Sequence, residues 1–208
     1  MIELDAVEVR VLGCLVEKDI TTPEYYPMTL NALVNACNQK SNRDPVVTFE
    51  EEDVVDALDR LGHKQLLSTL TGGGNRVPKY GHRLQEKLNL GRREVALLCE
   101  LMLRGPQTLG ELKDRASRMH RFSDTDEVER CLSALEFVKV LPKLPGTKEP
   151  RWAHLFSGEP VTQQASAAPA MPHERQDRVG QLETEVAILR ERVQTLEQQI
   201  ERLNQLFS

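Results

Sequence analysis

The sequence predicts a mainly α-helical fold with small β wings, in which tandem winged helix-turn-helix domains are followed by a C-terminal coiled-coil helix. Three observations lead to this prediction. Residues 48–82 combine an amphipathic helix with two strand-like segments around a glycine-rich tip, which is the second half of a winged helix-turn-helix unit. A similar pattern returns later in the chain, and residues 173–207 carry a heptad repeat.

The third helix of the first unit and its hairpin give the clearest local signals. Thr48 followed three residues later by Glu51 is a capping box, which predicts that the helix starts there. Gly62 is expected to end it. Residues 66–71 and 77–82 are predicted to be the two strands of the hairpin. The apolar face of the helix is formed by Val54, Val55, Leu58 and Leu61.

Three blocks of this unit return in the same order further along the chain. The apolar helix positions Val54, Leu58 and Leu61 return as Val128, Leu132 and Leu135. The segment PMTL at residues 27–30 returns as PQTL at 106–109, and PKYGH at 78–82 returns as PRWAH at 150–154. A period this long indicates duplicated domains rather than a solenoid.

The repeat sets the predicted domain boundaries. We expect winged-helix domain 1 over residues 1–88, domain 2 over residues 89–157, a flexible linker over 158–172 and a coiled coil over 173–208. Each winged-helix unit is small, so the two are expected to pack against each other. The linker is predicted from its Ala, Gln, Ser, Thr and Pro composition, which lacks apolar periodicity.

The other helices follow from apolar spacing and from breaker residues. In domain 1 we predict helices over residues 5–18 and 30–37, and Thr29 is expected to cap the second. In domain 2 the helices are predicted over residues 91–104, 108–119 and from about 124 to 137, followed by a short hairpin. His82 and His154 hold equivalent hairpin positions, which favours structural roles, and Tyr80 and Trp152 are expected to pack within the wings.

The C-terminal heptads predict a dimer. Position a is β-branched at most heptads and position d is leucine, which favours a parallel two-stranded coiled coil. A lone amphipathic helix that folds back on the body is the alternative. The positions expected to form the dimer are Val179, Leu182, Val186, Leu189, Val193, Leu196, Ile200 and Leu203.

Composition limits the kind of protein this is. The formal net charge is −5, and residues 1–90, 91–160 and 161–208 carry −4, +1 and −2, so no part has the basic excess of an electrostatically driven DNA binder. No apolar run is long enough to cross a membrane, and the first residues are not a signal peptide. The four cysteines lack metal-ligand spacing. We therefore predict a cytoplasmic protein with reduced thiols, without metal or cofactor and without enzymatic activity.

The predicted third helices are acidic, which disfavours conventional insertion into the major groove because carboxylates repel phosphate. Positive charge lies elsewhere, and Asn and Gln side chains of residues 31–42 would bond either to nucleic acid or to their own loop. The candidate nucleic-acid contacts are Lys40, Arg43, Arg76, Lys113, Arg115, Arg118, Arg121, Lys148 and Arg151.

Two segments carry a family resemblance. Residues 26–45, YPMTLNALVNACNQKSNRDP, and residues 91–96, GRREVA, are similar to the YceH family of uncharacterised bacterial proteins, and the similarity covers about residues 2–160. The resemblance implies a tandem winged-helix fold with a coiled tail in many members, and it brings no catalytic residues. The expected function is a regulatory binding protein. DNA, contacted through the winged helices, and a protein partner, contacted through acidic surfaces, stay open as ligands.

Overall fold

The structure is a computed structural model that describes residues 2–72, 75–143, 146–147 and 149–158. These residues fall within one compact unit, Met1–Thr162, and a second unit covers Gln163–Ser208. The predicted coiled coil, with its dimerisation positions, and nearly all of the predicted linker lie outside the described residues. The described part is mainly α-helical with small antiparallel sheets, as predicted.

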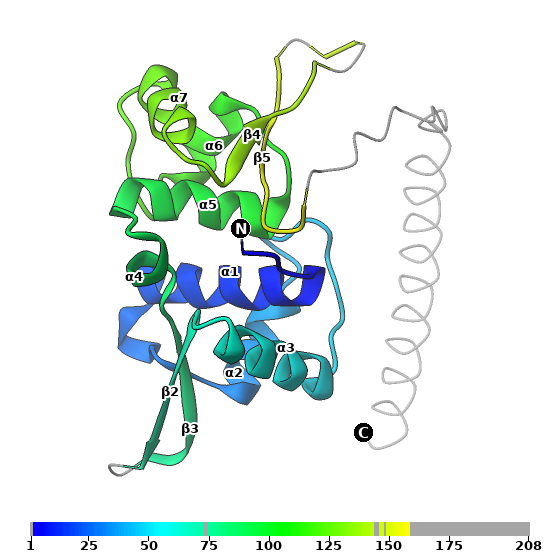
Figure 1. Ribbon diagram of the computed structural model, residues 1–208, viewed down its shortest axis with the longest axis vertical. Helices are drawn as coiled ribbons and strands as arrows, with labels where there is room; N and C mark the ends of the chain where they lie inside the picture. The colour runs from blue at the N-terminus through cyan, green and yellow to red at the C-terminus, as the bar shows by residue number, and fades with distance from the viewer. Residues whose placement is uncertain (1, 73–74, 144–145, 148, 159–208) are drawn as a thin grey trace, which may run out of the picture. The chain divides into compact units, whose positions relative to one another are not determined.

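The first half of the body contains three main helices, two short ones and a three-stranded sheet (Figure 1). The sheet has the order β1-β3-β2 and is antiparallel throughout. A short 3-10 helix, Pro23–Tyr25, precedes the sheet, and a short helix, α4 (Leu84–Leu88), follows it. The main elements are α1 (Ala6–Thr21), β1 (Met28–Thr29), α2 (Leu30–Cys37), α3 (Glu51–His63), β2 (Leu67–Gly72) and β3 (Asn75–His82).

The second half repeats this order with elements of equal or shorter length: α5 (Arg92–Arg104), α6 (Leu109–Ala116), α7 (Thr125–Ser133), β4 (Val138–Val140) and β5 (Trp152–His154). Strands β4 and β5 pair antiparallel, and Gln107 forms an isolated bridge with Trp152. In the first half, Met28 pairs with Tyr80 at the corresponding place. The sequence repeat therefore corresponds to equivalent backbone pairings in the two halves.

The two halves share a core formed where α1 packs against α5 (Figure 1). The predicted apolar face of α1 is only part of its buried surface, because α2 and α3 pack on α1 from the first half while α5 packs on it from the second. Gly13 marks the closest approach, since a Cβ atom there would lie 2.9 Å from Cδ2 of Leu103. Three charged residues of α1 are consequently buried: Glu8, Arg10 and Glu17.

Helix α3 differs from the prediction at both ends. It begins at Glu51 rather than near Thr48, because Asn38 exchanges two 2.8 Å hydrogen bonds with the backbone of Phe49 and keeps that segment extended. Gly62 does not end the helix, which continues to His63. The helix is closed instead by Gln65 at φ 60°, so that the N–H of Leu66 donates to the carbonyl of Leu61 at 3.0 Å.

The predicted cap of α2 is confirmed, and the helix spans differ from the predicted ones by a few residues. Thr29 is the N-cap of α2, and its hydroxyl accepts from the N–H of Ala32. Asp5 is the N-cap of α1, within a capping box completed by Glu8. Helices α6 and α7 end three and four residues before their predicted ends. Among the described residues, no helix is both long and apolar enough to cross a membrane.

Candidate functional site

A buried ionic cluster joins the two halves and contains two of the predicted nucleic-acid contacts. The guanidinium of Arg43 is fully buried and donates to both carboxylate oxygens of Glu17, at 3.1 and 2.5 Å. Arg118 contacts Glu17 at 2.6 Å and Glu100 of α5 at 2.9 Å. Arg104 approaches the same Glu100 at 3.1 Å. Two buried glutamates, one from each central helix, are thus neutralised by arginines from both halves.

The charges of this cluster are maintained by pairing. Burial alone would raise the pKa of Glu17, but the hydrogen bond and charge of Arg43, with help from Arg118, lower the pKa below its ordinary value. Burial would lower the pKa of Arg43, but Glu17 raises it, so both groups stay charged. The cluster therefore has a structural role, because it neutralises charges between α1 and α5.

Four of the predicted nucleic-acid contacts are engaged with other groups of the same chain. Arg43 lies in the interior, because its carboxylate partner Glu17 is itself buried in the shared core. Arg118 keeps 30% of its side chain exposed but is held by two carboxylates. Arg115 donates to Gln107 and pairs with Glu111, and Arg151 pairs with the same Glu111 and donates to the carbonyl of Pro106.

The remaining predicted contacts are not paired with carboxylates where the structure describes their side chains. Lys40 and Arg121 are exposed and Lys113 is half-buried. Within the described residues these three form no ion pair. The side chain of Arg76 and the whole of Lys148 lie outside the described residues.

The polar residues after α2 order their own loop. Asn38 is bonded to Phe49, Gln39 accepts from Arg43, and the side chain of Asn42 accepts from Arg104. The N–H of Asp44 donates to the carbonyl of Leu103 at 2.9 Å, which ties the loop to the second half. Of the two interpretations of this segment, local ordering is the one that these contacts favour.

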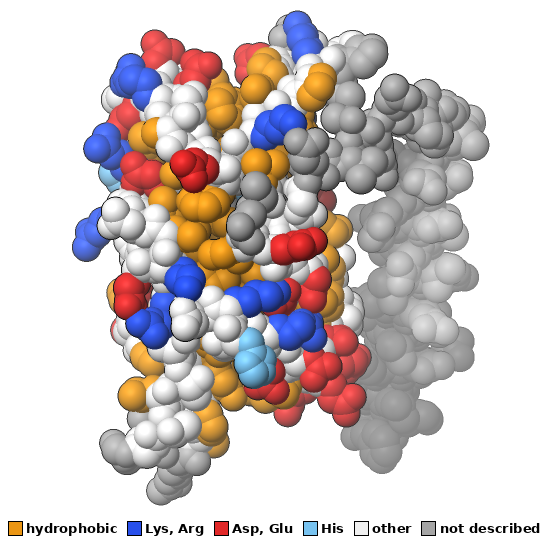
Figure 2. Space-filling view, viewed as in Figure 1, with side chains coloured by type: hydrophobic (Ala, Val, Ile, Leu, Met, Phe, Trp, Pro, Cys, Tyr) orange, Lys and Arg blue, Asp and Glu red, His pale blue; other side chains and the backbone are white. Residues whose placement is uncertain are grey.

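The third helices present carboxylates to solvent. On α3 the buried positions are apolar, whereas Glu51, Glu52, Asp53, Asp56 and Asp59 are exposed. In Figure 2 acidic side chains gather over this helix. On α7, Asp126 and Glu129 are exposed, and Glu127 pairs with Arg93 at 3.2 Å. A surface of this charge is suited to a cationic ligand and repels a phosphate backbone.

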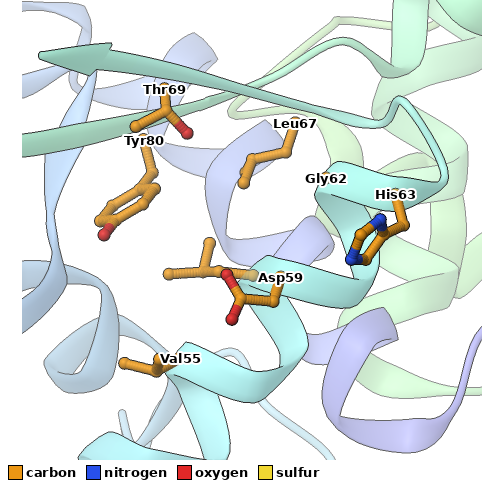
Figure 3. A pocket seen from close by; sticks show the side chains of 8 residues that line it. Val55, Asp59, Gly62, His63, Leu67, Thr69 and Tyr80 are labelled. Atoms are coloured by element: carbon orange, nitrogen blue, oxygen red, sulfur yellow. The ribbon is translucent and has the colours of Figure 1, made fainter.

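A groove lies between α3 and the β2–β3 hairpin (Figure 3). Its volume is about 260 Å³. The strands supply Leu67, Thr69 and Tyr80, and Thr69 and Tyr80 are register partners. The helix supplies Val55, Leu58, Asp59, Gly62 and His63. Figure 3 shows the two sets of side chains on opposite walls, where apolar side chains share the lining with Asp59, His63 and Thr69.

The groove was not predicted from the sequence, although two signals for it exist. Val55 is predicted to lie on the apolar face of the helix, but it lies outside the buried stripe of α3 and is 36% exposed. Gly62 lies within α3, whereas a glycine at this point of the sequence pattern predicts the end of the helix. Tyr80 was expected to pack within the wing, and it is half-buried with its ring along the groove.

Comparison with known proteins places most of this chain in one group. Residues 4–147 match the family model described as protein of unknown function, DUF480. A UPF0502 protein of Citrifermentans bemidjiense is 58% identical over 169 residues, which are 79% of this chain and 78% of that protein. A UPF0502 protein of Solibacter usitatus is 55% identical over 194 residues, covering 90% of this chain and 93% of that protein.

Proposed function

The chain belongs to the DUF480 family of UPF0502 proteins, and for this member we propose a non-enzymatic binding protein of regulatory type whose ligand is another protein. The sequence resemblance to the YceH family agrees with this membership. The observation that carries the proposal is the distribution of charge over the body. Exposed carboxylates cover α3 and α7, while the arginines expected to contact DNA are largely engaged with carboxylates of the same chain.

The proposed architecture is a tandem pair of winged helix-turn-helix domains. Each half has a helix, a bridging residue or short strand, two further helices and a hairpin, in that order. In such units the third helix and the wing are the usual contact surfaces of DNA-binding members. Here α3 would bring five exposed carboxylates to the phosphate backbone, which would oppose binding.

The proposal also includes the tail and the location of the protein. The heptads of residues 179–203 support a parallel coiled-coil dimer, which would present two bodies to one partner. The proposed location of this dimer is the cytoplasm. Two bodies on one ligand would raise the apparent affinity through the effective concentration of the second site.

DNA is the second candidate ligand, and exposed cations are the observation that favours it. Lys40 and Arg121 are exposed and form no ion pair within the described residues. They follow α2 and α6, which are equivalent helices of the two halves. One lysine and one arginine after these helices would suit a phosphate backbone, but they supply few of the contacts that tight electrostatic binding requires.

A salt titration separates the two ligand classes. The full chain is mixed with a random-sequence DNA duplex, and the dissociation constant is measured between low and physiological salt. We expect binding no tighter than about 10⁻⁴ M at physiological salt, and a log–log slope near zero. A steep slope that is reduced by the double variant Lys40→Glu with Arg121→Glu would contradict the proposal and favour DNA.

A further inference from the structure

We infer that the groove between α3 and the β2–β3 hairpin is a docking site for a segment of a partner protein that inserts one large apolar side chain and carries Lys or Arg beside it. The inference rests on the proposed function, because it states where a protein partner binds and which chemistry the partner presents. Four features support it: the walls of the groove, the glycine that keeps it open, its size and its charge.

The walls offer apolar contact that the folded chain leaves unfilled. Leu58 is almost completely buried beneath the groove, whereas Val55 is 36% exposed at its helical wall. Leu67 and Tyr80 are partly buried and line the facing wall. An apolar side chain placed between these walls would remove their exposed carbon surface from water, which is favourable at about 25 cal/mol per Å².

Gly62 has no side chain and therefore leaves space at the helical wall of the groove. Its backbone is helical and has no positive φ, so the conformation does not require glycine. Glycine within a helix costs about 0.5–1 kcal/mol relative to alanine. A Cβ atom at Gly62 would meet no atom within 4 Å, so the position opens onto free space in the groove. The residue thus opens a space that a larger side chain would fill.

The size of the groove indicates a side chain rather than a cofactor. A volume of about 260 Å³ is smaller than the ~300–1,000 Å³ of most small-molecule sites. It suits an apolar anchor of the kind that dominates protein interfaces. The hydroxyl groups of Thr69 and Tyr80 lie on the strand wall, where they would bond to the backbone of a bound segment.

The negative charge of the helical wall favours a partner with Lys or Arg beside its apolar side chain. Asp59 lines the groove, and Glu52, Asp56 and Asp59 follow one another at helical spacing on the exposed side of α3. No Lys or Arg is among the residues that line the groove. Lys or Arg beside the apolar anchor, on the side that faces α3, would therefore meet carboxylates, which gives specificity and faster association.

The direct test uses a synthetic peptide of about a dozen residues as the probe, with a central Leu between Lys and Arg, and measures its fluorescence anisotropy with the full chain. Two matched peptides replace the Leu by Ala, or every Lys and Arg by Glu. We expect the Leu peptide to bind, and the Ala peptide to bind at least about tenfold more weakly, as for loss of an interface anchor. The acidic peptide is expected not to bind.

Variants of the protein locate the binding site. Gly62→Phe would fill the groove and is expected to weaken binding of the Leu peptide at least about tenfold. Gly62→Ala is the matched control, because one methyl group leaves the groove open, and its affinity should stay near that of the wild type. Asp59→Asn should weaken binding and reduce its dependence on salt. Thermal melting of each variant verifies that the body is folded.

The outcomes distinguish this inference from the proposed function. Three results would contradict the inference that the groove is the docking site: equal binding of the Leu and Ala peptides, undiminished binding to the folded Gly62→Phe variant, or no binding of any peptide. In each case a protein partner would bind elsewhere on the chain. Self-association that Gly62→Phe abolishes would overturn the partner assignment in favour of a second copy of the chain. Failure of the proposed function itself would appear in the DNA titration as a steep salt slope.

Discussion

The hairpin of the first half has strands of six and eight residues, whereas the strands of the second half have three residues each. Three residues that line the groove of the first half have counterparts of a different type in the second. Val55 corresponds to Glu129 and His63 to Phe137, and the half-buried Tyr80 corresponds to Trp152, which is only 8% exposed. Phe137 stacks on Phe156 with ring centroids 5.8 Å apart.

This difference shows how one order of elements serves two purposes. In the second half, large aromatic residues fill the hairpin side and support the core around α5. In the first half, the corresponding side chains are smaller or polar and leave an open groove beside α3. We conclude that the second half mainly stabilises the body, while the first half carries the surface proposed to bind a partner.

The largest expected effect concerns the cluster that joins the halves. Arg43→Ala removes a fully buried guanidinium and leaves Glu17 buried with one arginine fewer. Breaking a buried ion pair in this way costs about 3–5 kcal/mol. Urea unfolding should show this loss, and the exposed control Lys40→Ala should stay within about 0.5 kcal/mol of the wild type. A loss below about 1 kcal/mol for Arg43→Ala would mean that the cluster does not hold the halves together.

The aromatic pair Trp152 and Tyr80 tests the division of roles directly. Trp152→Ala empties a buried site in the second half and should cost about 3–5 kcal/mol in the free energy of unfolding. Tyr80→Ala at the equivalent, half-buried place should cost less than about 2 kcal/mol. Equal losses in the free energy of unfolding, measured with denaturant, would show that the two hairpins contribute equally to stability.

The equivalent histidines predict different responses to acid. Nδ1 of His82 accepts from the N–H of Leu84, and its Nε2 lies 3.3 Å from Asp19. Nδ1 of His154 is buried without a partner within the described residues, and burial lowers the pKa of His154 to about 4. Burial also lowers the pKa of His82, but Asp19 opposes that shift.

The sign follows from proton uptake by the unfolded chain. Below about pH 6.5 unfolded His154 binds a proton that the folded state excludes, so stability is full above pH 6.5 and falls as pH approaches 4. His154→Gln should remove about 2–3 kcal/mol of this loss, measured by unfolding at pH 7 and pH 4. His82→Gln should change the pH dependence less. Parallel pH profiles for His154→Gln and the wild type would rule out this assignment.

The smallest effects come from two helical glycines with opposite surroundings. Gly62→Ala should stabilise the protein by about 0.5–1 kcal/mol, because the helix gains propensity and the methyl group enters open space. Gly13→Ala should destabilise it by about 1–3 kcal/mol, because the new methyl group would press on Leu103 between the two central helices. Thermal unfolding of both variants checks the signs, and the same sign for both would be contrary to the described packing.

Much of the fold was predictable because the chain repeats. In the structure Met28 pairs with Tyr80 and Gln107 pairs with Trp152, so the matched blocks correspond to equivalent pairings, which the repeat alone did not predict. Local capping by Thr29 was likewise visible in the sequence. The burial of α1 on several sides was not, because the periodicity of one helix does not reveal that a second half packs on it.

The candidate site was less predictable for physical reasons. Charged loop residues such as Arg43 are usually exposed, and only the three-dimensional position of Glu17 explains its burial. The groove is a space between α3 and the β2–β3 hairpin that the side chains of the chain do not fill. A sequence pattern does not show which spaces between elements stay unfilled. Gly62 is the residue in the sequence that could have indicated the groove. It was predicted to end α3, but it lies within the helix and opens onto free space.

The most direct test of the division between the halves is an NMR titration of the ¹⁵N-labelled full chain with the Leu-centred basic peptide. The account predicts saturable chemical-shift changes at α3, β2 and β3, including the amides of Val55, Gly62 and Thr69. The amides of α7, β4 and β5 should stay unchanged. Shifts of similar size at the equivalent places of both halves, or shifts confined to the second half, would contradict the claim that the first half carries the binding surface.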